Sequence, residues 1–120
     1  MFTRLFPLPD SSFFLFGPRG TGKTTWLRHV LPGALWFDLL RTQTFLALTR
    51  QPDSFRQQVL ARPKKSWVVV DEVQRLPALL NEVHALVAEY GRAYSFALSG
   101  SSARKLKRMD ANLLAGRAIN

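Results

Sequence analysis

The sequence contains no cysteine among its 120 residues and has few acidic side chains. The first absence excludes disulfide scaffolds and thiolate metal sites. The second leaves 17 Lys and Arg residues against 8 Asp and Glu, a formal net charge of +9. This excess of positive charge favours an anionic partner, which could be a nucleotide, a nucleic acid or a membrane surface.

Long apolar runs are also missing, since none reaches the roughly 18 residues that a membrane-spanning helix needs. The N-terminal segment has prolines at positions 7 and 9 and lacks the apolar region of a signal peptide. We therefore expect no membrane span and a cytoplasmic location. Hydrophobic residues still make up 47% of the chain, which is enough for a packed core, and the length allows a single domain.

Strand-like and helix-like segments alternate along the chain. Short apolar segments bounded by turn residues predict strands, and the valines at 68–70 are typical of a parallel strand buried on both faces. Apolar residues at helical spacing, with proline or glycine at the segment ends, predict helices. We expect strands over residues 12–16, 34–39, 66–71 and 94–99, and helices over 23–31, 42–48, 54–61 and 77–90. This alternation predicts an α/β fold with a parallel sheet.

The segment after the first strand matches the phosphate-loop pattern G-x-x-x-x-G-K-S/T at every required position. Its glycines allow a tight backbone whose N–H groups point at phosphate oxygens, and the following helix adds the positive end of its dipole. Lys23 would reach the β- and γ-phosphates, Thr24 would offer its hydroxyl to Mg²⁺, and Thr25 could contact the α-phosphate. The alternative is an ordinary glycine-rich turn with an exposed lysine. The candidate nucleotide-binding residues are Gly17, Pro18, Arg19, Gly20, Thr21, Gly22, Lys23, Thr24 and Thr25.

Two adjacent acidic residues, Asp71 and Glu72, follow the valine-rich strand directly. Because ligands bind at the carboxyl ends of strands in open α/β sheets, Asp71 is predicted to hold Mg²⁺. Glu72 is a candidate general base that would polarise the attacking water. The pair favours an ATPase of the additional-strand class, in which one strand separates the phosphate-loop strand from the acidic strand. A solvated acidic pair at a strand end is the alternative.

Further polar residues are weaker candidates. Ser99, at the end of the fourth strand, is predicted to lie beside the γ-phosphate, where a hydroxyl could sense phosphate or position water. Ser101 is nearly as good a candidate, although serine-rich turns are common without such a role. Gln74 could bond to the γ-phosphate region. Arg117 could reach a neighbouring subunit's γ-phosphate as an arginine finger, and a plain surface arginine is an equally good interpretation.

The C-terminal segment is basic and compatible with a helix. Its cationic side chains could bind the phosphate backbone of a nucleic acid, and the solvated face of a short helix is the favoured alternative. These residues are Arg104, Lys105, Lys107 and Arg108.

Several segments together carry a family resemblance: the phosphate loop, DEVQRLP, SGSS and LAGR. Over residues 12–119, the chain resembles the N-terminal part of bacterial and archaeal AAA-superfamily ATPases in which the ATPase core precedes a C-terminal domain of unknown function. The resemblance implies a three-layer α/β/α P-loop NTPase with the additional-strand order of RecA-like and AAA proteins, 5-1-4-3-2. It also implies that ATP and Mg²⁺ bind, with Lys23 and Thr24 as phosphate and Mg²⁺ contacts. Asp71 is then the Mg²⁺-associated acid, Glu72 the catalytic base, and the SGSS turn the sensor region.

The chain departs from this family at its end. Such proteins continue past LAGRA into a fifth strand, a helical region and the C-terminal domain, whereas this sequence stops at Asn120. We expect a single P-loop ATPase core over residues 1–120 that is incomplete at the C-terminus and lacks the fifth strand and the lid. The strand at 13–16 would then be an apolar edge, which predicts self-association or limited solubility unless a partner covers it.

The predicted function is Mg²⁺-dependent ATP binding with slow hydrolysis. ATP is favoured over GTP because no guanine-recognition segment is present. One alternative is a non-catalytic fragment that binds nucleotide or a partner. A small P-loop phosphotransferase is a further alternative, which the adjacent acidic pair and the lack of an arginine-rich lid disfavour.

Overall fold

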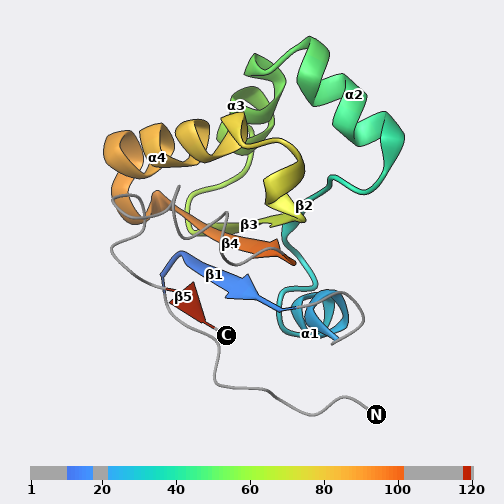
Figure 1. Cartoon of the computed structure of the whole chain (residues 1–120). Helices are drawn as coiled ribbons and strands as arrows, with labels where there is room; N and C mark the ends of the chain where they lie inside the picture. Colours follow the sequence, from blue (N-terminus) through green and yellow to red (C-terminus); the bar gives the residue numbers. More distant parts are fainter. Residues whose placement is uncertain (1–10, 18–21, 102–117, 120) are drawn as a thin grey trace.

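Strands and helices follow one another along the chain in the order that the apolar pattern predicts (Figure 1). The computed structural model describes residues 11–17, 22–101 and 118–119. Its elements are β1 (Phe13–Phe16), α1 (Lys23–Val30), β2 (Leu35–Asp38), α2 (Thr42–Arg50), α3 (Asp53–Leu60), β3 (Ser66–Asp71), the 3₁₀ turn η1 (Val73–Arg75), α4 (Ala78–Tyr90), the 3₁₀ turn η2 (Gly91–Ala93), β4 (Tyr94–Gly100) and β5 (Ala118–Ile119).

The strands form one parallel sheet in the order β2-β3-β4-β1-β5. β4 lies between β1, which precedes the phosphate loop, and β3, which ends in the acidic pair. This arrangement confirms the additional-strand order. The three valines of β3 are fully buried, as expected for a central strand with helices on both faces.

A short fifth strand is present, which corrects the expectation that it would be missing. Ala118 and Ile119 pair in parallel with β1 opposite Phe14 and Leu15. The expectation came from the family resemblance, which places the fifth strand after the LAGRA segment, whereas β5 begins at Ala118, the last residue of that segment. β1 therefore has a paired neighbour on both sides over part of its length (Figure 1).

Helices cover both faces of the sheet, so the predicted three-layer α/β/α architecture is confirmed. Successive residues of a strand point to opposite faces. On one face, Phe13 and Leu15 of β1 pack with Trp26 and Leu27 of α1. On the other face, residues of β1, β3 and β4 pack against α3 and α4. Figure 1 shows α1 on one side of the sheet and α3 and α4 on the other.

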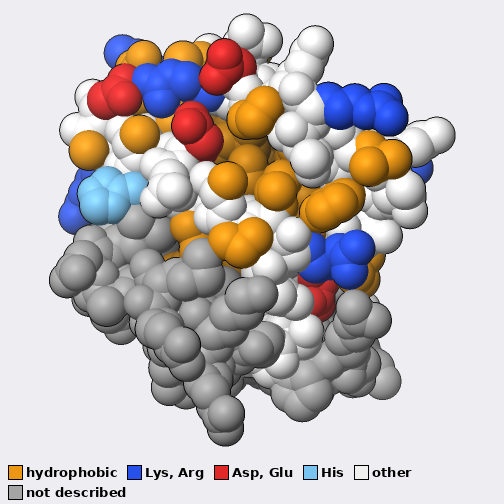
Figure 2. All heavy atoms as spheres, turned by 45° about the horizontal axis from the view of Figure 1, so that its top comes forward, with side chains coloured by type: hydrophobic (Ala, Val, Ile, Leu, Met, Phe, Trp, Pro, Cys, Tyr) orange, Lys and Arg blue, Asp and Glu red, His pale blue; other side chains and the backbone are white. Residues whose placement is uncertain are grey.

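The outer surface of α3 and α4 carries charged side chains of both signs. Arg56 of α3 forms ion pairs with Glu82 and Glu89 of α4. The distance from Arg56 Nη1 to Glu82 Oε1 is 3.9 Å. Figure 2 shows this side of the molecule, where basic and acidic side chains lie next to one another near one end. Within the described part of the chain, no helix has the length and apolar character needed to cross a membrane.

Candidate functional site

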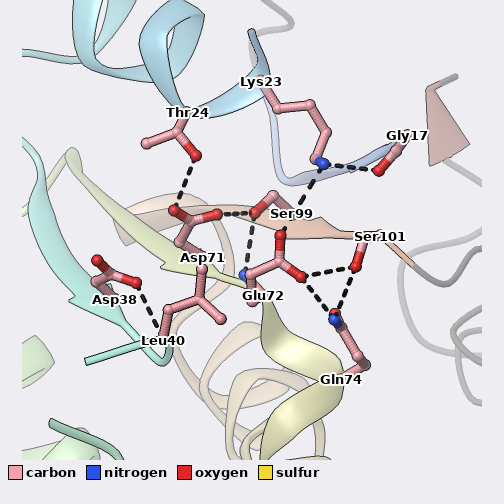
Figure 3. A network of polar contacts seen from close by, with 10 residues as sticks. All are labelled: Gly17, Lys23, Thr24, Asp38, Leu40, Asp71, Glu72, Gln74, Ser99 and Ser101. Carbon is pink, nitrogen blue, oxygen red and sulfur yellow. Dashed lines mark hydrogen bonds and ion pairs between the residues drawn. The ribbon is translucent and has the colours of Figure 1, made fainter. Parts of the chain in front are cut away.

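The carboxyl ends of β1, β3 and β4 meet at one edge of the sheet. The backbone N–H of Gly17, just after β1, donates to the carbonyl of Gly100 at the end of β4, with 3.2 Å between N and O. β3 lies on the other side of β4 in parallel register, with Val70 opposite Leu98. The start of the phosphate-loop segment, the acidic pair and the serine turn are therefore brought together by the sheet alone (Figure 3).

Lys23 is a buried cation at the first position of α1. The helix begins there because Gly22, its N-cap, adopts a left-handed conformation with φ 88°, which glycine tolerates without strain. The Lys23 side chain is only 5% exposed. Its Nζ donates to the Gly17 carbonyl at 2.6 Å and lies 4.0 Å from Glu72 Oε2. A buried ammonium needs such partners because its charge is costly to remove from water.

The carboxylate of Asp71 joins the helix after the phosphate loop to the end of β4. Thr24 Oγ1 donates to Asp71 Oδ2 at 2.9 Å, and Ser99 Oγ donates to Asp71 Oδ1. The Ser99 hydroxyl also accepts a hydrogen bond from the backbone N–H of Glu72 at 3.1 Å. Ser99 is thus a fully buried link between the two acidic residues (Figure 3).

Glu72 has an unusual backbone conformation. Its φ of 61° and ψ of 51° lie in the left-handed region, which is uncommon for a residue with a side chain and turns the chain from β3 into η1. The Glu72 side chain is buried, and its Oε1 accepts from Gln74 Nε2 at 2.6 Å and from Ser101 Oγ at 2.9 Å. Strained backbone of this kind is concentrated at functional sites.

A family model described as AAA domain matches residues 10–120. The chain belongs to the AAA domain family. The match covers nearly the whole chain and supports a nucleotide-binding P-loop core, in agreement with the sheet order and the clustering of polar side chains after β1, β3 and β4. No curated protein matches the sequence closely enough to count as a relative.

Most of the residues that the sequence singles out in this AAA core lie together. Gly17, Lys23, Thr24, Asp71, Glu72 and Ser99 are in one network, and both serine candidates belong to it, since Ser101 contacts Glu72. Thr25 lies on α1 with an exposed side chain. The candidates outside the described residues are Pro18, Arg19, Gly20, Thr21, Arg104, Lys105, Lys107, Arg108 and Arg117.

One acidic residue at this edge was not singled out from the sequence. Asp38, the last residue of β2, lies opposite Asp71 in the sheet register. Its Oδ1 accepts a hydrogen bond from the backbone N–H of Leu40 at 3.0 Å. An acidic residue at the carboxyl end of a predicted strand was the available signal, but its position beside Asp71 depends on how β2 and β3 pair.

The oxygen atoms around Asp71 suit a hard cation such as Mg²⁺. Mg²⁺ is usually held by one or two carboxylates together with substrate phosphates. Thr24 and Asp71 offer a hydroxyl and a buried carboxylate that face each other across 2.9 Å. Among the described residues, no cluster of three or more His, Asp or Glu side chains forms a self-sufficient metal cage.

Proposed function

We propose that residues 1–120 form a single P-loop ATPase core that binds ATP with Mg²⁺ and hydrolyses ATP slowly. The observation that supports this most directly is the hydrogen bond between Thr24 and Asp71, 47 positions apart in sequence. It brings the hydroxyl of the phosphate-loop motif to the acid that follows β3. In a nucleotide-binding core, these two groups share the task of holding Mg²⁺.

Lys23 and the phosphate-loop residues 17–22 are assigned to the phosphates of ATP. Lys23 is held near the loop by the Gly17 carbonyl, and its Nζ lies 4.0 Å from Glu72 Oε2. A nucleotide would offer the Lys23 ammonium phosphate oxygens that carry full negative charge. An ammonium–phosphate pair has charge on both partners, whereas the bond to the Gly17 carbonyl has charge on the donor alone, so nucleotide binding is favoured.

Thr24 and Asp71 are the residues that would hold Mg²⁺. When bound, Mg²⁺ neutralises charge on the β- and γ-phosphates. Ser99 supports this role because its hydroxyl donates to Asp71 and fixes the orientation of that carboxylate. Asp71 is 3% exposed, so few waters compete for its oxygens.

Glu72 is assigned as the general base. Its carboxylate lies on the same side of the site as Lys23, which would contact the γ-phosphate. In the proposed reaction, Glu72 accepts a proton from the water that attacks the γ-phosphorus. A positioned base contributes about 10²- to 10⁴-fold in rate. An arginine from a neighbouring subunit, for which Arg117 is the candidate, would add about 10³- to 10⁵-fold, so the isolated core is expected to be slow.

The test is a titration of a fluorescent ATP analogue with and without Mg²⁺, combined with a phosphate-release assay. The wild type should bind in an Mg²⁺-dependent manner, and Lys23→Ala should lose binding. Glu72→Gln should bind but release phosphate about 10²- to 10⁴-fold more slowly. Lys64→Ala is the matched control because Lys64 is exposed and precedes the start of β3, whereas Asp71 lies at the other end of that strand.

Other outcomes of the same test point to the alternatives. Binding without phosphate release by the wild type would make the chain a non-catalytic nucleotide-binding core. Phosphate transferred to an acceptor would make it a phosphotransferase. No binding by a folded wild type would refute the proposed function.

A further inference from the structure

The two carboxylate oxygens of Glu72 have different surroundings. Oε1 accepts two hydrogen bonds, from Gln74 Nε2 at 2.6 Å and from Ser101 Oγ at 2.9 Å. Oε2 faces the ammonium of Lys23 at 4.0 Å. Figure 3 shows the Gln74 and Ser101 side chains converging on the same oxygen from η1 and from the end of β4.

The hydrogen bonds among Glu72, Gln74 and Ser101 can be assigned from their chemistry. An ionised carboxylate only accepts, so the nitrogen of the Gln74 amide must face Glu72. Gln74 Nε2 also lies 3.2 Å from Ser101 Oγ, to which it donates. The Ser101 hydroxyl is then left to donate its single proton to Glu72. The three side chains form a closed triangle that a flipped Gln74 amide would break.

This triangle opposes a competing arrangement of Glu72. A direct ammonium–carboxylate hydrogen bond has a length of about 2.7–2.9 Å. The observed separation of 4.0 Å between Lys23 and Glu72 is well beyond that. A carboxylate held only by its own side-chain torsions would be drawn onto the buried ammonium, where it would occupy Lys23 and lose access to water. Two hydrogen bonds on the opposite oxygen resist this movement.

We propose that Gln74 and Ser101 are positioning residues that hold Glu72 Oε1 so that Oε2 remains available to accept a proton from the attacking water. This inference rests on the proposed ATPase function. As the water oxygen bonds to the γ-phosphorus, the bond to the β,γ-bridging oxygen breaks and its electron pair leaves with ADP. One water proton passes to Glu72, while Gln74 and Ser101 exchange no proton with the substrate.

The test removes each hydrogen bond while keeping side-chain size similar. Gln74→Met and Ser101→Ala should each lower kcat by about 10- to 100-fold, because a misplaced base loses part of its contribution. The dissociation constant for the ATP analogue should change by less than about 2-fold, since neither residue is assigned to the nucleotide. Ser101→Thr keeps a hydroxyl and should retain most of the activity.

An exposed pair of the same chemistry provides the control. On α3, Gln58 Nε2 bonds to Ser54 Oγ at 2.9 Å. Gln58→Met and Ser54→Ala should leave kcat unchanged. In a Glu72→Gln background, neither Gln74→Met nor Ser101→Ala should lower the residual rate further, because they act through Glu72.

Three results would count against the inference. Unchanged kcat in Gln74→Met and Ser101→Ala, with an active wild type, would overturn it and leave the ATPase proposal standing. A parallel loss of melting temperature and ATP affinity would show that the two residues only support the fold. Absence of turnover in the wild type would refute the ATPase proposal and this inference with it.

Discussion

At the scale of single residues, the hydroxyl of Thr24 is the group whose role is easiest to isolate. It donates to Asp71 Oδ2 at 2.9 Å, where it can exchange that bond for Mg²⁺. We expect Thr24→Ala to reduce the gain in nucleotide affinity caused by Mg²⁺ by about 10-fold, the loss of roughly one good oxygen contact. Affinity in excess EDTA should stay the same. A fluorescence titration with and without Mg²⁺ measures both quantities.

Two further variants make the Thr24 experiment specific. Thr24→Ser keeps the hydroxyl and should preserve the effect of Mg²⁺. Thr49→Ala removes an exposed hydroxyl on α2 that donates to the carbonyl of Phe45 at 2.7 Å, and this variant should not change the Mg²⁺ dependence. Equal Mg²⁺ dependence in Thr24→Ala and the wild type would contradict the assignment.

The sequence identifies the residues of the site better than it identifies their partners. Lys23, Thr24, Asp71 and Glu72 follow from fixed spacings within one motif or directly after one strand, so their meeting at one edge of the sheet could be expected. The contacts of Gln74 and Ser101 with Glu72 could not. They depend on the left-handed turn at Glu72 and on the register of β4 against β3, and no local pattern encodes either.

At the scale of elements, the turn that leads into β3 stores backbone strain. Lys65 has φ 69°, in the left-handed region, while its side chain is exposed. A residue with a Cβ pays about 1 kcal/mol or more in this conformation, and glycine does not. We expect Lys65→Gly to raise the free energy of unfolding by about 0.5–1 kcal/mol. This is the net effect of relieving the strain and of the extra conformational entropy that glycine gives the unfolded chain. Chemical denaturation measures this change.

The neighbouring lysine supplies the control for this turn. Lys64 is also exposed, and its φ angle is negative, so its backbone is not in the left-handed region. Lys64→Gly gains no relief of strain and should lower the free energy of unfolding by about 0.5–1 kcal/mol. If both glycine variants changed stability in the same direction, the strain assigned to Lys65 would be wrong.

The attachment of α3 to the sheet depends strongly on one aromatic side chain. Phe55 is fully buried, with its ring centroid 4.9 Å from that of Phe37 and 6.4 Å from that of Phe96. We expect Phe55→Ala to cost about 3–5 kcal/mol, because it removes buried apolar surface and leaves a cavity. Leu46→Ala on α2, where the side chain is 39% exposed, should cost less than about 1 kcal/mol. Comparable losses in the two variants would contradict this view of the core.

The elements themselves were predictable where their apolar pattern is long and continuous. The strand at 66–71 matches β3 at both ends, and the other expected strands and helices agree with the structure to within one or two residues, apart from the unexpected β5. The valine run works as a signal because a central parallel strand is buried on both faces. β5 was expected to be missing because the family pattern places it after LAGRA, whereas it begins within that segment, where it pairs with β1.

At the scale of the whole molecule, we expect charge and the edge of the sheet to have opposite effects on self-association. β5 pairs with β1 opposite only Phe14 and Leu15, so part of this apolar strand lacks a strand partner on that side among the described residues. The residues of β1 are nevertheless buried, so the edge strand on this side of the sheet is β5, and an edge strand favours pairing between copies. The net charge of +9 repels them, and salt screens that repulsion, with a Debye length of about 20 Å at 0.02 M and about 4 Å at 0.5 M.

We therefore expect self-association to be weak at low ionic strength and to increase with salt, which sedimentation velocity at about 0.02 M and about 0.5 M salt can measure. Replacing two exposed cations, Lys64→Glu and Arg92→Glu, lowers the formal net charge by four and should strengthen association at low salt. Association that weakened with salt would show that it depends on attraction between opposite charges. A monomer under all these conditions would show that β5 covers the edge of β1 well enough, and that the self-association expected from the apolar strand does not occur.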